Sequence, residues 1–215
     1  MVYIIIKYVA KCVIPLKYNI VIKNGDKLHE IEGPLIVSSN HTSSLDPILI
    51  GLILDNPVYF MAKKELFRTQ IGAWFFTAMN AISIDRNAYM LIRPIRKVLT
   101  LLERKEVVGI FPEGKRVKKD RKGKPKNGVA FFALKARVPV LPIGLIINDK
   151  RRLFRRKVTV IIGEPIDLSD CPFKNSYSQI SEYIMEVSHT LVNREQLSDK
   201  YKTIIEPHPQ MSKKM

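Results

Sequence analysis

The chain has 215 residues, of which 46% are hydrophobic, and this length is sufficient for one domain with a substantial core. It carries 36 Lys and Arg residues against 20 Asp and Glu residues, a formal net charge of +16 at pH 7 that predicts anionic partners: phosphates, an acidic protein or a membrane surface. The two cysteines, Cys12 and Cys171, lie far apart, which argues against a disulfide framework or a cysteine metal site and favours a reducing compartment.

The first 14 residues form an apolar run that Lys7 and Lys11 interrupt. The run is too charged and too short to span a bilayer, which needs about 20 apolar residues, and it does not have the pattern of a signal peptide. A helix in the membrane interface would place both lysines at the lipid headgroups, whereas a core helix would pack on the domain. Our domain assignment follows the first interpretation: a short amphipathic, membrane-associating segment at residues 1–17.

The domain itself is expected over residues 18–206, followed by a frayed basic tail at 207–215. Residues 18–31 alternate in places and contain Asn24-Gly25-Asp26, which predicts a hairpin leading to the next strand. In chain order, we then expect a strand at 34–37, a helix at 47–54, a strand at 58–62, a helix at 71–78, a strand at 81–86, a helix at 88–105, a strand at 107–111, a helix at 128–136, strands at 138–147 and 158–162, and a helix at 179–194. Strands that alternate with helices predict a single α/β domain, a layered mixed sheet flanked by helices.

The stretch from Asn40 to Pro47 joins the first of these strands to a helix. Because proline favours the first helical position, Asp46 is expected to be the N-cap. The turn can fold back so that the His41 imidazole meets the Asp46 carboxylate. A carboxylate on one ring nitrogen leaves the other free to take a proton from a hydroxyl, so His41 and Asp46 are candidate catalytic residues. The plain alternative is a capping aspartate beside a polar turn histidine.

Three other strands also end in polar or small residues, at 83–86, 110–116 and 138–144. Sites in open α/β sheets form at the carboxyl ends of strands. The second stretch combines an acid, a glycine and two cations, a set that suits a ligand with hydroxyls and a phosphate. Arg86 would add a phosphate contact. Each stretch also has a plain interpretation, as a surface ion pair or an ordinary turn.

Taken in order, the four stretches resemble the four sequence blocks of the glycerolipid acyltransferases, and most closely the 1-acyl-sn-glycerol-3-phosphate (lysophosphatidic acid) acyltransferase family. Residues 40–47 resemble its His-x4-Asp block, 84–86 its second block, 111–114 its third and 138–142 its fourth. The resemblance covers residues from about Pro34 to about Pro165. It implies a glycerolipid-acyltransferase-like fold.

The resemblance also implies roles for particular residues. Arg86 and Lys63, with Lys64 as the alternative to Lys63, would bind the acceptor phosphate, and the fourth block would serve the acyl donor. The third block supplies further residues on the acceptor and phosphate side, namely Glu113, Gly114, Lys115 and Arg116. The sequence departs from the family at Lys115, where Thr or Ser is usual, and at Val117, where Ser is usual, which leaves the acceptor open.

The reaction that the resemblance implies is acyl transfer from a thioester to the sn-2 hydroxyl of 1-acyl-sn-glycerol-3-phosphate, giving phosphatidic acid in phospholipid biosynthesis. The co-substrate would be acyl-coenzyme A or an acylated carrier protein, with no further cofactor and no metal. The enzyme would sit at the cytoplasmic side of a membrane, peripheral or monotopic, against anionic lipids. Alternatives are another acceptor, such as glycerol-3-phosphate or a different lysolipid, and a non-catalytic module that binds anionic lipid or nucleic acid. We expect no nucleic-acid partner, because the sequence contains no motif for one.

Lys and Arg make up eight of the twelve residues from Lys115 to Lys126. Such a loop could lie on anionic headgroups, or it could bind an acidic carrier protein or the phosphates of coenzyme A. A solvated loop is the plain alternative.

Overall fold

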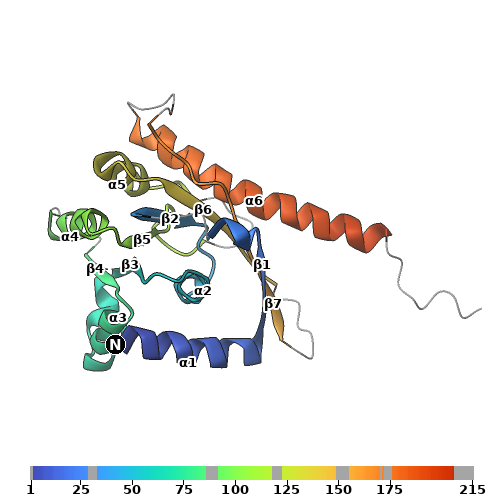
Figure 1. Cartoon of the computed structure of the whole chain (residues 1–215), viewed down its shortest axis with the longest axis horizontal. Helices are drawn as coiled ribbons and strands as arrows, with labels where there is room; N and C mark the ends of the chain where they lie inside the picture. The colour runs from blue at the N-terminus through green and yellow to red at the C-terminus, as the bar shows by residue number, and fades with distance from the viewer. Residues whose placement is uncertain are drawn as a thin grey trace, which may run out of the picture.

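The computed structural model describes residues 2–28, 33–85, 92–117, 123–148, 155–169, 171 and 176–205, with 199–205 as backbone alone (Figure 1). Its strands are β1 (Tyr18–Lys23), β2 (Leu35–Ser39), β3 (Val58–Lys63), β4 (Ile82–Ile84), β5 (Val107–Ile110), β6 (Val140–Ile147) and β7 (Arg156–Ile162). Its α-helices are α1 (Val2–Lys17), α2 (Asp46–Ile53), α3 (Gln70–Ala78), α4 (Ile92–Glu103), α5 (Gly128–Ala136) and α6 (Tyr177–Ile205), and η1 (Gly25–Leu28) and η2 (Lys64–Phe67) are 3-10 helices. The strands and helices expected from residue 34 onward are confirmed within the described residues, most of them with ends that differ by a few residues, but α6 continues to Ile205, 11 residues past its expected end.

The strands form one seven-stranded sheet in the order β1-β7-β6-β2-β5-β3-β4. All neighbouring pairs are parallel except β6 and β7, which are antiparallel, so the expected mixed sheet is confirmed. Every residue of β2 and β5 is buried, as is typical of parallel strands that are covered on both faces. The carboxyl ends of the parallel neighbours β2, β5 and β3 therefore lie side by side along one end of the strands.

The hairpin predicted around Asn24-Gly25-Asp26 is wrong. Strand β1 pairs in parallel with β7, from Tyr18 opposite Arg156 to Lys23 opposite Ile161, and η1 follows it. Asn24 does adopt a left-handed conformation, with φ of 56°, and its side chain donates a hydrogen bond to the Ile162 carbonyl at 3.0 Å. Asn24 therefore binds the end of β7. Strand β1 pairs with β7 along its whole length instead of with the residues that follow the turn.

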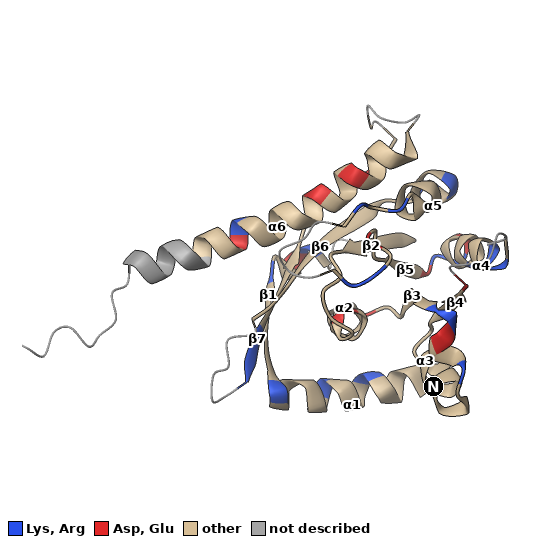
Figure 2. Cartoon of the chain, turned by 180° about the vertical axis from the view of Figure 1, so that it is seen from behind, with Lys and Arg blue, Asp and Glu red and all other residues tan. Residues whose placement is uncertain are grey.

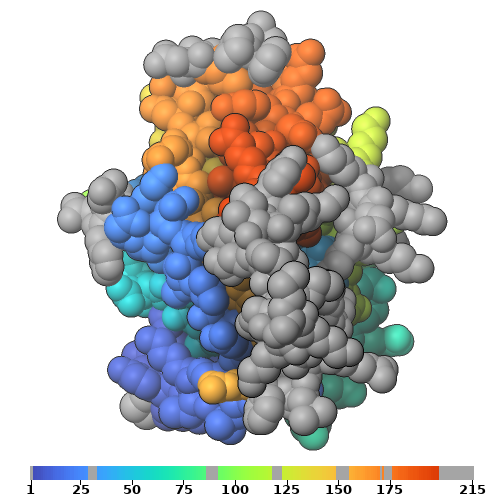
Figure 3. Space-filling view, turned by 90° about the vertical axis from the view of Figure 1, so that its right-hand side faces the viewer, coloured from blue at the N-terminus to red at the C-terminus, as the bar shows by residue number. Residues whose placement is uncertain are grey.

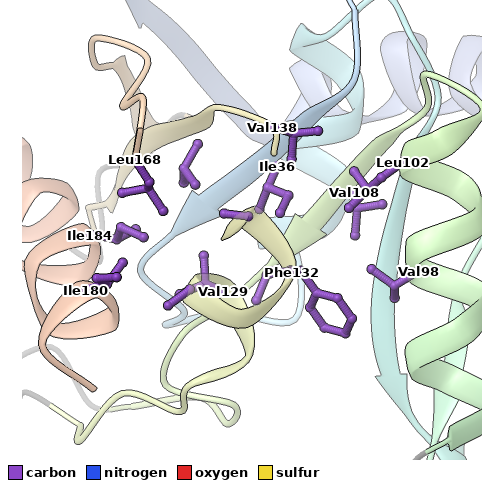
Figure 4. Packing of buried hydrophobic residues seen from close by; sticks show 14 of the residues in the cluster. Ile36, Val98, Leu102, Val108, Val129, Phe132, Val138, Leu168, Ile180 and Ile184 are labelled. Atoms are coloured by element: carbon purple, nitrogen blue, oxygen red, sulfur yellow. The ribbon is translucent and has the colours of Figure 1, made fainter. Parts of the chain in front are cut away.

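Two hydrophobic clusters fill the space on either face of the sheet. In the first, side chains of α4, α5 and α6 meet the sheet, including Val98, Phe132 and Ile184 against Ile36 and Val108 (Figure 4). The second cluster lies under α1 and α2 on the opposite face. Each fully buried Ile, Leu or Val side chain contributes about 1.5–3 kcal/mol, so the helical layers on both faces stabilise the sheet whose edge carries the polar loops.

Helix α6 crosses the sheet and continues past its edge (Figure 1). Its Glu195 side chain pairs with Lys23 of β1 at 2.6 Å. In Figure 3 the N-terminal part of the chain, in blue, lies beside this helix, in orange to red, on the same face of the molecule. The last described helix therefore packs on the first strand.

Helix α1 packs on the domain with one side only. Its Lys7 amine donates hydrogen bonds to the carbonyls of Leu54 and Asp55, just after the end of α2, and partial burial lowers the pKa of Lys7. The expectation that Lys7 lies at lipid headgroups is therefore wrong, because the carbonyl end of α2 attracts the cation. The other side of α1 is apolar and exposed, with Tyr8 at 65% and Leu16 at 77%. No helix in the described part of the chain is long and apolar enough to span a membrane.

Candidate active site

A cleft of about 1360 Å³ opens where the carboxyl ends of β2, β3 and β5 meet. His41, which follows β2, and Lys63, the last residue of β3, both line it. So do Lys115 and Arg116 from the loop after β5. Residues that are far apart in the sequence thus share one cleft because their strands are neighbours in the sheet.

The predicted contact between His41 and Asp46 is present. Imidazole Nδ1 lies 2.9 Å from Asp46 Oδ2, and the aspartate side chain is fully buried. The backbone amides of Thr42 and Ser43 donate to the same oxygen at 2.7 and 2.8 Å. One carboxylate oxygen therefore folds the loop over itself and fixes the orientation of the ring.

Asp46 is not the N-cap that the sequence predicted. The N-cap is Leu45, whose carbonyl accepts the Leu49 amide at 2.9 Å, so that α2 begins at Asp46 and Pro47 is its second residue. The first turn of a helix does not use its own amides, so proline fits at either position. The shift leaves the Asp46 carboxylate at the positive end of the helix, which stabilises its charge.

The His41 ring is held on one face and at one nitrogen. It stacks on Phe111 with centroids 4.1 Å apart, and Phe111 stacks on Phe60 of β3 at 5.3 Å. Since Nδ1 faces Asp46, the tautomer that donates from Nδ1 leaves Nε2 with a lone pair. The His41 side chain is 17% exposed, so a ligand in the cleft can reach this nitrogen.

Glu113 holds the backbone of the same loop. Its carboxylate is buried, and Oε2 accepts the His41 amide at 2.8 Å. The His41 carbonyl in turn accepts the Val117 amide at 2.9 Å. The loop after β5 therefore holds both backbone polar groups of His41, a contact across 72 residues that no local pattern could have indicated.

Gly114 sits at a close approach between two parts of this loop. Its φ of +65° is in the region that favours glycine, and a Cβ there would lie 2.9 Å from the Lys126 side chain. Lys126 donates its amide to the Pro112 carbonyl at 2.8 Å and also lines the cleft. It is a cation of the site that the sequence analysis did not single out.

The predicted phosphate-side residues are placed as follows. Lys115 and Arg116 are exposed and line the cleft. Lys63 lines it too, and its amine lies 3.0 Å from Glu65, which lowers the pKa of the Glu65 carboxyl. Lys64 pairs with Asp85 at 3.4 Å and is not among the described residues that line the cleft, so its position favours Lys63 of the two. Arg86 lies outside the described residues.

The remaining walls of the cleft are apolar and come from helices on either side. Phe75 of α3 and Met79, the residue after this helix, line the cleft, as do Phe131 of α5 and Tyr3 of α1. In α3, Phe75 lines the cleft, whereas Trp74 is 61% exposed. An apolar chain fits this part of the cleft, while the cations lie beside His41. In the described part of the chain, no group of three or more His, Cys, Asp or Glu residues could hold a metal ion.

The chain belongs to the Acyltransferase family, whose model matches residues 19–146, more than half of its length. It is 28% identical over 194 residues to the 1-acyl-sn-glycerol-3-phosphate acyltransferase of Bacillus subtilis (strain 168), an alignment that covers 86% of this chain and 94% of that protein. The protein of the same name from Streptococcus pneumoniae (strain ATCC BAA-255 / R6) is 32% identical over 153 residues. That alignment covers 68% of this chain and 55% of the Streptococcus pneumoniae protein, so the chain spans about half of that relative.

The fold is also similar to a solved structure, the 1-acyl-sn-glycerophosphate (LPA) acyltransferase PlsC from Thermotoga maritima. The TM-score is 0.71 at 24% sequence identity, over 90% of this chain and 79% of the other. The family resemblance inferred from the four sequence blocks is therefore confirmed, and so is the expected fold.

Proposed function

We propose that the protein transfers a fatty acyl group from an acyl thioester to the sn-2 hydroxyl of 1-acyl-sn-glycerol-3-phosphate, giving phosphatidic acid. The observation that carries the proposal is the His41–Asp46 pair, with Nε2 left open at a cleft that has cations on one side and apolar walls on the other. The acceptor is the one in the names of the relatives from Bacillus subtilis and Streptococcus pneumoniae.

In the first step, His41 Nε2 takes the proton of the sn-2 hydroxyl while the oxygen attacks the thioester carbonyl. The Asp46 carboxylate stabilises the imidazolium that forms. The tetrahedral intermediate then collapses: the carbon–sulfur bond breaks, and the leaving thiolate takes the proton from His41. The amides of Thr42 and Ser43 already donate to Asp46, so other donors must hold the oxyanion.

The acceptor phosphate would lie among the amines of Lys63 and Lys115 and the guanidinium of Arg116, which line the cleft with His41. Charge-assisted hydrogen bonds to phosphate are roughly twice as strong as neutral ones, and they would set the distance from phosphate to hydroxyl. Arg86 keeps the phosphate-binding role that the family resemblance gives it. Glu113 acts indirectly, because its carboxylate accepts the backbone amide of His41 and so holds the loop that carries the imidazole.

The protein would act as a peripheral or monotopic enzyme at the cytoplasmic face of a membrane. Helices α1 and α3 lie at the same end of the molecule, the lower end in Figure 2. Both expose large apolar side chains, among them Ile71 and Trp74 of α3. Tyr3 of α1 and Phe75 of α3 line the cleft, so this end is continuous with the apolar walls. Lipid chains could then pass from the bilayer to the cleft without crossing water.

The test is thiol release from palmitoyl-coenzyme A, with and without lysophosphatidic acid, by the wild type and by His41→Ala. Loss of a positioned general base costs on the order of 10²–10⁴ in rate, so His41→Ala should lose that much in kcat while it still binds lysophosphatidic acid. Arg194→Ala, an exposed residue of α6, serves as the control. Ordinary turnover by His41→Ala would sink the mechanism, and absence of release with palmitoyl-coenzyme A and with palmitoylated carrier protein would sink the function.

Lys115 stands where the family usually has Thr or Ser, so the acceptor needs its own test. Initial rates are compared for lysophosphatidic acid, glycerol-3-phosphate and a neutral lysolipid at equal concentration. We expect lysophosphatidic acid to be acylated fastest, because the cleft offers both cations for the phosphate and apolar walls for the acyl chain. A faster rate with glycerol-3-phosphate would assign the other acceptor.

A further inference from the structure

Helix α4 carries a basic face that the proposed mechanism does not use. Three exposed cations project from the helix and a fourth follows its last residue, and we call them the α4 basic face: Arg93, Arg96 and Lys97 of the helix, and Arg104 after it. The opposite side of the helix, with Val98 and Leu102, is buried in the core. Packing therefore fixes the helix so that the four cations point outward together.

Within the described part of the chain, the cations of this face outnumber the acids beside them, Glu103 and Glu106. Among the described residues, no carboxylate forms a salt bridge with any of its four cations, and the nearest acid along the helix is the exposed Glu103 at one edge. A shallow depression of about 360 Å³ runs along the face, where Ile92 and Thr100 add an apolar and a hydroxyl group. A concave, unpaired basic surface is suited to an acidic partner.

The same helix also forms a wall of the active-site cleft. Pro94 and Ile95, in its first turns, line the cleft that contains His41. A partner that lies on the α4 basic face is thus separated from the cleft by a single helix. A thioester carried on a flexible arm of that partner could enter the cleft beside α4.

The position of α4 favours a soluble partner over a membrane. The exposed apolar side of α1 faces away from the sheet at the lower end of the molecule, whereas α4 lies level with the sheet (Figures 1 and 2). A bilayer that contacts α1 would not reach along the α4 basic face. Of the two acyl donors of the proposed reaction, the acyl carrier protein is the acidic protein.

We propose that the α4 basic face docks an acidic acyl carrier protein, which delivers its acyl thioester to the cleft beside α4. This rests on the proposed function and names the partner that supplies its donor. The cations of the α4 basic face would contact the carrier protein and not the acyl chain. Their loss should therefore affect a carrier-protein donor more than a coenzyme A donor with the same acyl group.

The experiment compares palmitoylated acyl carrier protein with palmitoyl-coenzyme A as donor, at 0.05–0.1 M salt. The variant is Arg96→Glu/Lys97→Glu, and the control is Arg156→Glu/Arg194→Glu, two exposed cations of β7 and α6. We expect kcat/KM for the carrier-protein donor to fall at least about tenfold in the α4 variant, because like charges across an interface repel. The rate with palmitoyl-coenzyme A and both rates of the control should remain near wild type.

An equal loss with both donors, no loss with the carrier protein, or a wild type that uses only palmitoyl-coenzyme A would overturn the docking proposal. So would a loss of binding to anionic vesicles by the α4 variant, because the face would then belong to the membrane. No turnover by the wild type with either donor would instead count against the proposed function, and calorimetry with the carrier protein would then test docking directly.

A separate contact, between Glu113 and His189, points to a role for a residue outside the four sequence blocks. The Glu113 carboxylate uses Oε2 for the His41 amide, and its other oxygen, Oε1, lies 3.4 Å from Nε2 of His189 on α6. Both side chains are largely buried, at 2% and 16% exposed, and His189 Nε2 has no hydrogen-bond partner among the described residues, so Glu113 Oε1 at 3.4 Å is the acceptor that it faces. A buried carboxylate needs donors on both oxygens, and His189 faces the second.

We infer that His189 is a positioning residue for His41, acting through Glu113. It lies beyond residues 19–146, the part of the chain that the family model matches. When His189 holds Oε1, the carboxylate keeps Oε2 on the His41 amide, and the loop keeps Nε2 of His41 aimed into the cleft. A shift of the loop would lower the rate of the proton transfer and leave acceptor binding intact.

The test uses His189→Ala and His189→Gln, because the glutamine amide can donate to Glu113 whereas alanine cannot. We expect His189→Ala to lose on the order of tenfold in kcat with an unchanged KM for lysophosphatidic acid, and His189→Gln to recover most of the loss. A wild-type kcat for the alanine variant, or a glutamine variant no better than alanine, would overturn the role. The Tm of both variants separates a loss of folding from a loss of position.

Discussion

At the scale of single residues, the site depends on two buried carboxylates with different partners. Asp46 binds the side chain of His41 and two amides of its own loop, whereas Glu113 binds the main chain of His41 from a distant loop. Asp46 sets the tautomer of the imidazole, and Glu113 sets the position of the backbone that carries it. Both are buried, so the loss of one partner leaves a charge that water cannot reach.

Asp46→Asn tests the charge behind the imidazole. Because the amides of Thr42 and Ser43 donate to the oxygen that faces Nδ1, the asparagine carbonyl oxygen would take that position, and the variant would lose the negative charge that stabilises the imidazolium. We expect kcat to fall by about 10²–10⁴ with little change in KM for lysophosphatidic acid. The measurement is thiol release with palmitoyl-coenzyme A, and Asp55→Asn, an exposed residue after α2, is the control. A fall of less than tenfold would contradict the assignment.

At the scale of secondary-structure elements, three strands and the loops after them build the site. Strand β3 contributes Phe60, the loop after β5 contributes Phe111, and the loop after β2 contributes His41, and the three rings stack in that order. The strands are neighbours in the sheet, so a displacement in one strand reaches the imidazole through ring contacts.

Gly109→Ala in β5 tests this transmission. A Cβ at this position would lie 2.1 Å from the Phe60 ring, so the ring has to move. We expect a loss of about 1–3 kcal/mol in the free energy of unfolding, together with a lower kcat, because Phe60 supports Phe111. Gly128→Ala, at the start of α5, is the matched control: nothing lies within 4 Å of its Cβ, and stability should stay equal or rise. Equal stability of the two variants in urea denaturation would refute the packing argument.

At the scale of the whole molecule, the exposed apolar side of α1 and the α4 basic face are assigned to different partners. The exposed apolar side of α1 lies at one end, the α4 basic face lies beside the cleft, and the cleft joins them through its apolar walls. The two surfaces recognise different partners by different forces. Apolar burial is insensitive to salt, whereas charge attraction weakens as the Debye length shortens to about 8 Å at 0.15 M.

Ile5→Asp/Val9→Asp tests the membrane surface. Both side chains are more than half exposed, so the fold should tolerate the change, but each would otherwise bury apolar area in the bilayer. Burial of such a side chain contributes about 1.5–3 kcal/mol, so partition to vesicles should fall more than tenfold. Co-flotation with anionic vesicles measures it, with Tyr183→Asp/Leu197→Asp on α6 as the control. An equal fall in the control, or none in the α1 variant, would place the membrane surface elsewhere.

The sequence by itself determined the features that depend on neighbours along the chain. The contact between His41 and Asp46 spans five positions and is formed by the turn and the start of α2. The alternation of strands and helices follows from local apolar patterns, and it predicted the layered sheet. A resemblance to known sequence blocks then added the family, which the comparisons confirmed.

Only the tertiary structure decided which distant residues meet. It paired β1 with β7 where the turn signal at Asn24 predicted a hairpin, and it directed Lys7 inward to the end of α2. It also brought Glu113 to the His41 amide, and His189 to Glu113. The physical reason is the same in each case: strand order and helix packing set these contacts, and both result from the burial of the whole core rather than from any short stretch of the chain.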